Sequence, residues 1–128
     1  MESTLKLCAY ENFTISLEKS REINDQKTEC INLNHIGTCY MNLNMPEESY
    51  EYFVKANKLA IDIDLQQSVV HTYNNLGKWF IEFNQDIIKA EDYYQKAFNL
   101  SESILYIDGK HAAENGLNDL SFLRSSQN

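Results

Sequence analysis

Histidine is the commonest metal ligand in proteins, and this chain has three, His35, His71 and His111. They lie far apart along the sequence and fit no known ligand spacing, so we interpret them as surface histidines. The three histidines therefore predict no metal centre.

Other motifs that carry chemistry are incomplete. Asp62, Asp64 and Asp86 do not form a calcium loop, which needs oxygen ligands on a short frame centred on glycine. Gly109 and Lys110 stand without the rest of a phosphate-binding loop. Serine, histidine and aspartate occur without a motif that would position a nucleophile. We therefore expect no enzyme activity and no cofactor.

The composition is that of a helical, acidic chain. Its 128 residues correspond to about one domain, and four glycines with one proline argue against a fold with many tight turns. The formal net charge of −8 disfavours nucleic acid and anionic membranes as partners, because both attract basic surfaces. A basic or neutral protein partner fits this charge better.

The N-terminus and the cysteines indicate an intracellular protein. The first residues, MESTLKLCAY, contain no basic region followed by a long apolar run, as a signal peptide would. Cys8, Cys30 and Cys39 are odd in number and lack C-x-x-C spacing, so we expect reduced thiols in the core. The expected location is the cytoplasm.

Two segments of the chain are similar to each other: NHIGTCY at 34–40 and NNLGKWF at 74–80. Each places a large aliphatic residue before a glycine and an aromatic residue three positions after it. A second pattern of small, aromatic and small residues follows each of them: Ser49, Phe53 and Ala56, then Ala90, Tyr94 and Ala97, with one extra residue in the second turn. An earlier copy reads Ala9, Phe13 and Ser16.

These patterns predict pairs of antiparallel helices. Residues i, i+4 and i+7 share one helix face, and small residues there let a second helix approach closely. Gly37 and Gly77 serve the same purpose on the preceding helices, where a side chain of the partner helix occupies the space that the glycine leaves. We expect helices at about 3–23, 27–43, 46–63, 66–83, 87–106 and 109–124, with a frayed tail at 125–128.

The pattern resembles the tetratricopeptide repeat, in its long-repeat variety. One repeat is matched by Leu33, Ile36, Gly37, Tyr40, Ser49, Phe53 and Ala56, and another by Tyr73, Leu76, Gly77, Phe80, Ala90, Tyr94 and Ala97. The resemblance implies an all-α fold of helical hairpins stacked as a short right-handed solenoid. It implies a single domain over 1–124, with the second helix of a partial repeat at 3–23, repeats at 27–63 and 66–106, and a capping helix at 109–124 that lacks a Leu-Gly pair.

In this family the first helix of each repeat lines a groove. By resemblance, the groove positions are Asn34, His35, Thr38, Met41, His71, Asn74, Asn75, Lys78 and Ile81. Asn34 and Asn74 begin the two similar segments, and their carboxamides could pair with the backbone of an extended peptide. The alternative is that they are solvated polar residues on a helix surface. With Lys78 as the one basic groove residue, the family's clamp for acidic chaperone tails is not expected.

The sequence thus predicts a non-enzymatic scaffold that binds a peptide or helix of a partner protein. The alternative is an architectural subunit of a large assembly, held by its ends and edges. HIGTCYMNLN, AEDYYQKAFNLSES and ENGLNDL are similar to tetratricopeptide components of the ciliary outer-dynein-arm docking complex, which would place the protein in the cilium or axoneme. The segment 1–23 lacks a preceding partner helix, so a longer array or a partner would cover it.

Overall fold

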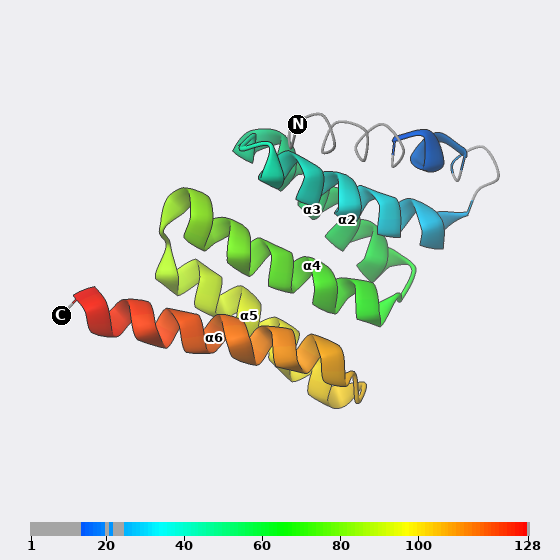
Figure 1. Ribbon diagram of the computed structural model, residues 1–128. Helices are drawn as coiled ribbons and strands as arrows, with labels where there is room; N and C mark the ends of the chain where they lie inside the picture. The colour runs from blue at the N-terminus through cyan, green and yellow to red at the C-terminus, as the bar shows by residue number, and fades with distance from the viewer. Residues whose placement is uncertain (1–13, 20, 22–24, 128) are drawn as a thin grey trace. The chain divides into compact units, whose positions relative to one another are not determined.

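The computed structural model describes residues 14–19, 21 and 25–127 of the chain, and all of its regular elements there are helical. The chain divides into two compact units, Met1–Ser68 and Val69–Asn128 (Figure 1). In the described part of the chain, no helix is long and apolar enough to cross a membrane.

The first unit is built on a hairpin of two helices, α2 (Gln26–Asn42) and α3 (Pro46–Asp62). Asp25 begins α2, where its side chain accepts a hydrogen bond from the Thr28 backbone N–H at 3.2 Å. Pro46 stands in the first turn of α3, where its missing N–H has no helical partner to lose. Between the helices, Asn44 takes a left-handed conformation with φ of 59°. Local chemistry therefore sets both ends of this hairpin.

The core of the first unit lies between these helices and the helical segment 14–19. Leu17, Leu33, Ile36 and Ala56 form the buried cluster, and Tyr40, Tyr52 and Leu59 pack around it. The rings of Tyr40 and Tyr52 stack with their centroids 5.5 Å apart. The hairpin is thus held mainly by apolar and aromatic packing.

The second unit contains α4 (Gln66–Trp79), a π-helical turn (Phe80–Asn84), α5 (Ile87–Ser103) and α6 (Ile107–Gln127). Its α4 begins shortly before the unit boundary. Gln85 ends the π-helical turn with φ of 51°, and the Asp86 side chain accepts a hydrogen bond from the Lys89 N–H at 3.0 Å. Asp86 therefore caps α5 as Asp25 caps α2.

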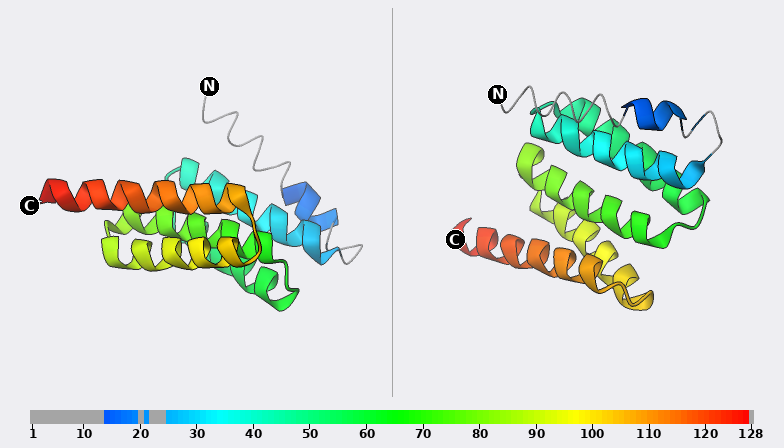
Figure 2. Two further views of the ribbon diagram at one scale, coloured as in Figure 1. Left: turned by 90° about the horizontal axis from the view of Figure 1, so that it is seen from below. Right: turned by 45° about the vertical axis from the view of Figure 1, so that its right-hand side comes forward.

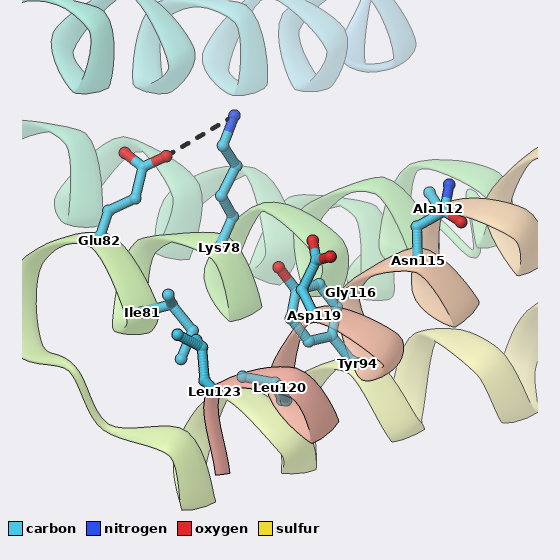
Figure 3. Close-up of a pocket in the computed structure, with 10 residues that line it drawn as sticks. All are labelled: Lys78, Ile81, Glu82, Tyr94, Ala112, Asn115, Gly116, Asp119, Leu120 and Leu123. Atoms are coloured by element: carbon cyan, nitrogen blue, oxygen red, sulfur yellow. Dashed lines mark ion pairs between the residues drawn. The ribbon is translucent and has the colours of Figure 1, made fainter. Parts of the chain in front are cut away.

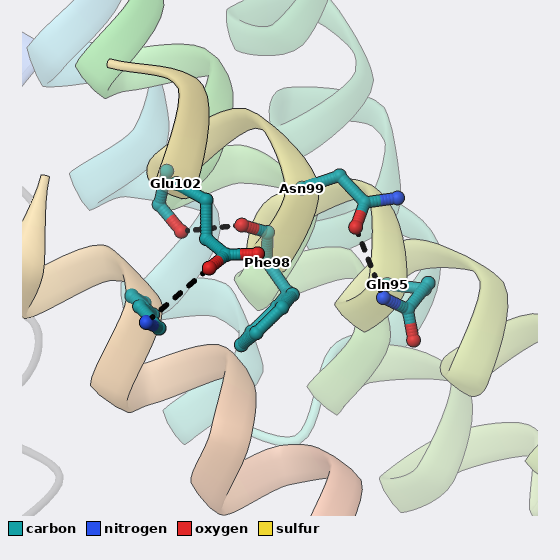
Figure 4. Close-up of polar contacts among 6 residues, drawn as sticks. Gln95, Phe98, Asn99 and Glu102 are labelled. Atoms are coloured by element: carbon teal, nitrogen blue, oxygen red, sulfur yellow. Dashed lines mark hydrogen bonds and ion pairs between the residues drawn. The ribbon is translucent and has the colours of Figure 1, made fainter. Parts of the chain in front are cut away.

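The core of the second unit joins all three of its α-helices. Val70 of α4, Ala97 of α5 and Ala113 of α6 are fully buried and in contact. The α5 and α6 helices form an antiparallel pair (Figure 2). An ion pair of 3.4 Å between Lys110 and Glu102 links them at their connected ends, beside a hydrogen bond along α5 from Gln95 to Asn99 (Figure 4). Helix α6 is therefore an integral part of this unit.

Several boundaries differ from those expected from the sequence. The fourth helix gives way to the π-helical turn at residue 80, and α5 ends at Ser103 instead of 106. Helix α6 begins at Ile107, two residues before the expected start at 109, because the turn forms at Leu105, whose φ is 57°. The tail expected at 125–128 continues α6 to Gln127.

The expected first helix, 3–23, lies largely outside the described residues, as do Ala9 and Phe13 of the early pattern. Within that range, residues 14–19 and residue 21 are helical. The prediction of one domain over 1–124 and that of a right-handed stack remain predictions, since they concern how the two units are arranged.

Candidate functional site

The glycine of the first repeat contacts the aromatic ring of its own hairpin. A methyl group on Gly37 would lie 2.7 Å from two ring carbons of Phe53, far inside a normal van der Waals contact. Phe53 is fully buried, and Ser49 donates a hydrogen bond of 2.8 Å to the Gly37 carbonyl. The absence of a side chain at Gly37 thus brings α2 and α3 together.

The second unit uses one aromatic ring against two glycines. Methyl groups on Gly77 of α4 and on Gly116 of α6 would both collide with the ring of Tyr94, which comes from α5. At Gly77 the nearest ring carbon would be 2.9 Å away, and at Gly116 the approach is closer still. Tyr94 therefore lies where all three helices of this unit meet.

Sequence reasoning missed Gly116. It follows Gly77 at almost the same interval as Gly77 follows Gly37, but Asn115 replaces the aliphatic residue that precedes the other two glycines. Spacing was therefore the only signal in the sequence. Helix α6 repeats the glycine of a first helix, so it corresponds to the start of a third repeat.

The other positions of that third repeat have become small or polar. When Gly77 is aligned with Gly116, Tyr73, Leu76 and Phe80 of the second repeat correspond to Ala112, Asn115 and Asp119. Tyr73 and Phe80 contact Tyr93 of α5, whereas Ala112, Asn115 and Asp119 are all exposed. The surface of α6 therefore departs from the repeat pattern at these three positions, and the prediction that this helix caps the array stays a prediction.

A pocket of about 290 Å³ lies between the middle of α6 and the C-terminal end of α4 with the π-helical turn that follows it, and Tyr94 is at its base (Figure 3). On the α4 side it is lined by Lys78, Ile81 and Glu82, and on the α6 side by Ala112, Asn115, Gly116, Asp119, Leu120 and Leu123. Two of the predicted groove residues, Lys78 and Ile81, thus meet at one concave site. None of the remaining lining residues was singled out from the sequence as a binding residue, and Tyr94 was expected only to pack between helices.

The charges at this pocket are mostly negative. The Lys78 ammonium lies 3.8 Å from a Glu82 carboxylate oxygen, so each offsets the other. Among the described residues, Asp119 has no hydrogen-bond or ion-pair partner. Burial raises the pKa of Tyr94 to about 12, and the negative charges of Asp119 and Glu82 add to this shift. The electrostatic field at the pocket therefore disfavours further negative charge.

Two predicted groove residues earlier in α4 make polar contacts with α6 or with the turn that precedes it. His71 Nε2 lies 2.7 Å from the Tyr106 hydroxyl, and Asn74 donates a hydrogen bond of 3.3 Å to the Gly109 carbonyl. The other amide atom, Asn74 Oδ1, is buried and has no partner in the described part of the chain. Asn75 is half-buried. Asn74 thus joins two helices of its own unit, a role that the sequence did not predict.

The predicted groove residues of the first unit differ in exposure. His35 is exposed, Asn34 and Thr38 are half-buried, and Met41 is buried at 8% exposure. Thr38 donates a hydrogen bond of 3.2 Å to the Asn34 carbonyl, one helical turn earlier. Met41 therefore belongs to the core in this structure and is not presented to a partner. The proposed ladder of Asn34 and Asn74 involves both units and stays a prediction.

The cysteines of α2 are poor candidates for chemistry. Cys30 is fully buried, and its thiol lies 3.4 Å from the Ala56 carbonyl oxygen. Burial raises the pKa of both Cys30 and Cys39, so neither favours the reactive thiolate. Within the described ranges, no three His, Cys, Asp or Glu side chains are grouped closely enough to hold a metal ion.

Helical hairpins joined through glycine–aromatic contacts, with a concave site between successive first helices, define an all-α helical-repeat scaffold. Residues 32–60, which cover most of the α2–α3 hairpin, match the family model of the tetratricopeptide repeat. This match supports a protein of the tetratricopeptide repeat type, whose repeats typically serve as interaction modules without catalytic activity. No curated protein matches the chain, and the similarity to ciliary docking components is not supported.

Proposed function

We propose that this chain is a non-enzymatic scaffold that binds a peptide or short helix of a partner protein along its first helices. The observation that carries this proposal is the pocket between α4 and α6, which has an aromatic base, apolar walls and a few polar groups at its edge. Binding sites for peptides combine these features, with an apolar anchor for affinity and polar groups for orientation.

The size of the pocket suits a side chain better than a cofactor. Its volume of about 290 Å³ is at the lower end of the range for small-molecule sites. Ile81 and Leu123 are half-buried in the free chain, so an apolar side chain placed against them would remove more of their surface from water. We therefore assign the pocket to one or two anchor residues of a bound segment.

The polar residues next to the pocket would extend this surface. His71, Asn74 and Asn75 precede Lys78 on α4. In the first unit, Asn34, His35 and Thr38 of α2 remain proposed groove residues. Because Asn74 already bonds the Gly109 carbonyl, replacing it with alanine should cost stability as well as any peptide contact. Asn34→Ala is therefore the cleaner test of the carboxamide ladder.

A matched pair of isoleucine substitutions tests the proposal. Ile81 lines the pocket, and Ile61 of α3 is 52% exposed and lies outside it. Peptides selected from a phage-displayed random library should bind the wild-type chain and the Ile61→Glu variant with similar affinity. Their affinity for the Ile81→Glu variant should be at least tenfold lower, as measured by fluorescence anisotropy. Equal binding to both variants, or no selected peptide, would count against a binding site at this pocket.

The alternative, an architectural role in a large assembly, is favoured by apolar side chains around α6. Leu105, Ile107 and Phe122 are 87%, 66% and 75% exposed. By contrast, Leu120 is buried and Leu117 and Leu123 are half-buried, so these leucines of α6 do not form an exposed patch. If Phe122→Ser abolishes recovery of partners from the native cell while Ile81→Glu does not, the architectural role gains, and ciliary partners would point to a docking complex.

A further inference from the structure

We propose that the pocket between α4 and α6 selects a basic, apolar segment of a partner protein: an aliphatic side chain seated on Leu120 and Leu123, next to a lysine or arginine at Asp119. This inference rests on the proposed function and specifies the chemistry of the partner at that site. It is carried by the charge and the apolar surface that the pocket brings together.

One of the two carboxylates at the pocket, that of Asp119, is not paired with a positive charge in the described part of the chain. Lys78 and Glu82 form an ion pair across one turn of the helix, with their side chains 61% and 43% exposed. Asp119 faces the same pocket from α6 and, among the described residues, has neither an ion pair nor a hydrogen bond (Figure 3). A cation bound at Asp119 would therefore complete the charge balance of the site.

The base of the pocket is also affected by negative charge. Tyr94 is 8% exposed, and Asp119 and Glu82 both oppose the loss of its proton. Asp119 and Glu82 are themselves exposed, so a cation bound there would be attracted by both carboxylates, and added salt would weaken this attraction.

The apolar lining defines the rest of the occupant. Leu120 is buried beneath the pocket, whereas Leu123 and Ile81 are half-buried on either side of it. Lysine and arginine place their methylene stems on apolar surface while the charged end reaches a polar group. A basic residue beside an aliphatic one would therefore satisfy both the carboxylate and the apolar walls.

The net charge of the whole chain works in the same direction. At −8, it attracts basic segments and repels acidic ones at a distance, and added salt weakens this effect. An acidic segment would meet Asp119 and Glu82 together, with only Lys78 to offset them. Charge complementarity therefore selects the basic partner over the acidic one.

The experiment compares selected peptides with neutral analogues on the complete chain. Peptides enriched from the phage-displayed library should contain lysine or arginine beside an aliphatic residue. Replacing that basic residue with citrulline should weaken binding about three- to tenfold at low salt, and Asp119→Asn should weaken binding of the basic peptide by a similar factor without changing that of the citrulline peptide. Asp108→Asn is the control, because Asp108 is also exposed on α6 but does not line the pocket.

The outcomes separate this inference from the proposed function. If enriched peptides are lost with Ile81→Glu but show no basic preference and ignore Asp119→Asn, the pocket binds peptides and the inferred chemistry is wrong. If no peptide depends on Ile81, both proposals fall. Asp119→Lys provides a second test, since it should favour a glutamate-containing analogue over the original basic peptide.

Discussion

The two units place an aromatic ring at the same point of the repeat pattern and use it differently. Phe53 is fully buried against Gly37, whereas Tyr94 retains 8% exposure, contacts both Gly77 and Gly116, and forms the base of a pocket. In both units the glycine makes room for the ring. The second unit shows that such a ring also becomes the base of a pocket when the next helix places polar residues beside it.

The two units also differ in the charge of their concave surfaces. A pocket of about 250 Å³ in the first unit is lined by more basic than acidic groups: Arg21, Lys55 and Lys58 against Glu29 and Asp62. The pocket of the second unit has Glu82 and Asp119 against Lys78. One fold therefore presents opposite charge preferences in its two halves, set by residues outside the repeat pattern.

The largest expected difference between the two rings is in their contribution to stability. Phe53→Ala should lower the free energy of unfolding by about 3–5 kcal/mol, because it removes a ring with no exposed surface. Tyr94→Ala should cost less, since part of that ring already borders an open pocket. Urea unfolding followed by circular dichroism measures both, and equal costs would contradict the distinction between core ring and pocket base.

High pH should destabilise the chain through Tyr94 but not through Phe53. Burial raises the Tyr94 pKa from 10.0 to about 12, so the folded state keeps a proton that the unfolded state loses. Stability from this source is complete below pH 10 and falls by up to about 3 kcal/mol as pH rises to 12. The loss between pH 9.5 and 11.5 in urea unfolding should be smaller for Tyr94→Phe, and an identical loss would show that Tyr94 is not the group responsible.

Alanine substitutions at Gly37 and Gly116 test whether the two rings need the space that these glycines leave. Replacing an exposed glycine inside a helix by alanine normally raises the free energy of unfolding by about 1 kcal/mol. Gly116→Ala and Gly37→Ala should instead destabilise by about 1–3 kcal/mol, because the added methyl groups would overlap the Tyr94 and Phe53 rings.

A second substitution distinguishes overlap with the ring from other effects of the methyl group. Combining Gly116→Ala with Tyr94→Leu removes the ring that the methyl group would meet, so the cost of the alanine should shrink in the double-mutant cycle. An unchanged cost in that background would indicate that the contact at Gly116 is not the reason for glycine there.

Exchanging one hydroxyl group between the two rings compares their surroundings, and the smallest effect is expected at Tyr94. Phe53→Tyr should cost about 1–3 kcal/mol, since it places a hydroxyl in a fully buried site. Tyr94→Phe should change stability by less than about 0.5 kcal/mol, because this hydroxyl borders a pocket. Thermal unfolding of both variants provides the comparison, and a large cost for Tyr94→Phe would show that its hydroxyl has a structural role.

The sequence predicted the helices well because their boundaries depend on local chemistry. The side chains of Asp25 and Asp86 cap the first turns of their helices, and the ring of Pro46 fits the first turn of α3. The turn at Leu105 was not predictable, because a leucine in a left-handed conformation gives no signal of its own. For that reason the start of α6 was predicted at 109, whereas the helix begins at Ile107.

The candidate site was less predictable than the fold. Lys78 and Ile81 followed from the repeat register, but the residues facing them belong to α6, where only the spacing of Gly116 preserved the pattern. A pocket depends on how far two helices diverge around a side chain such as Tyr94, and that distance is a property of tertiary packing. Asn74 was interpreted either as a peptide-binding residue or as a solvated one, and nothing in the sequence indicated its hydrogen bond to the Gly109 carbonyl.

The π-helical turn at Phe80–Asn84 explains how the longer hairpin keeps its partners aligned. The segment from Gly77 to Tyr94 is one residue longer than the segment from Gly37 to Phe53, yet both rings meet the glycine of their hairpin. A π-helical segment accommodates one inserted residue by widening a single turn. Had that insertion been carried into the body of α5, it would have rotated the tyrosine about 100° away from α4. A change in chain length between the two helices is thus accommodated in the π-helical turn, and the glycine–aromatic contacts that join the helices are kept.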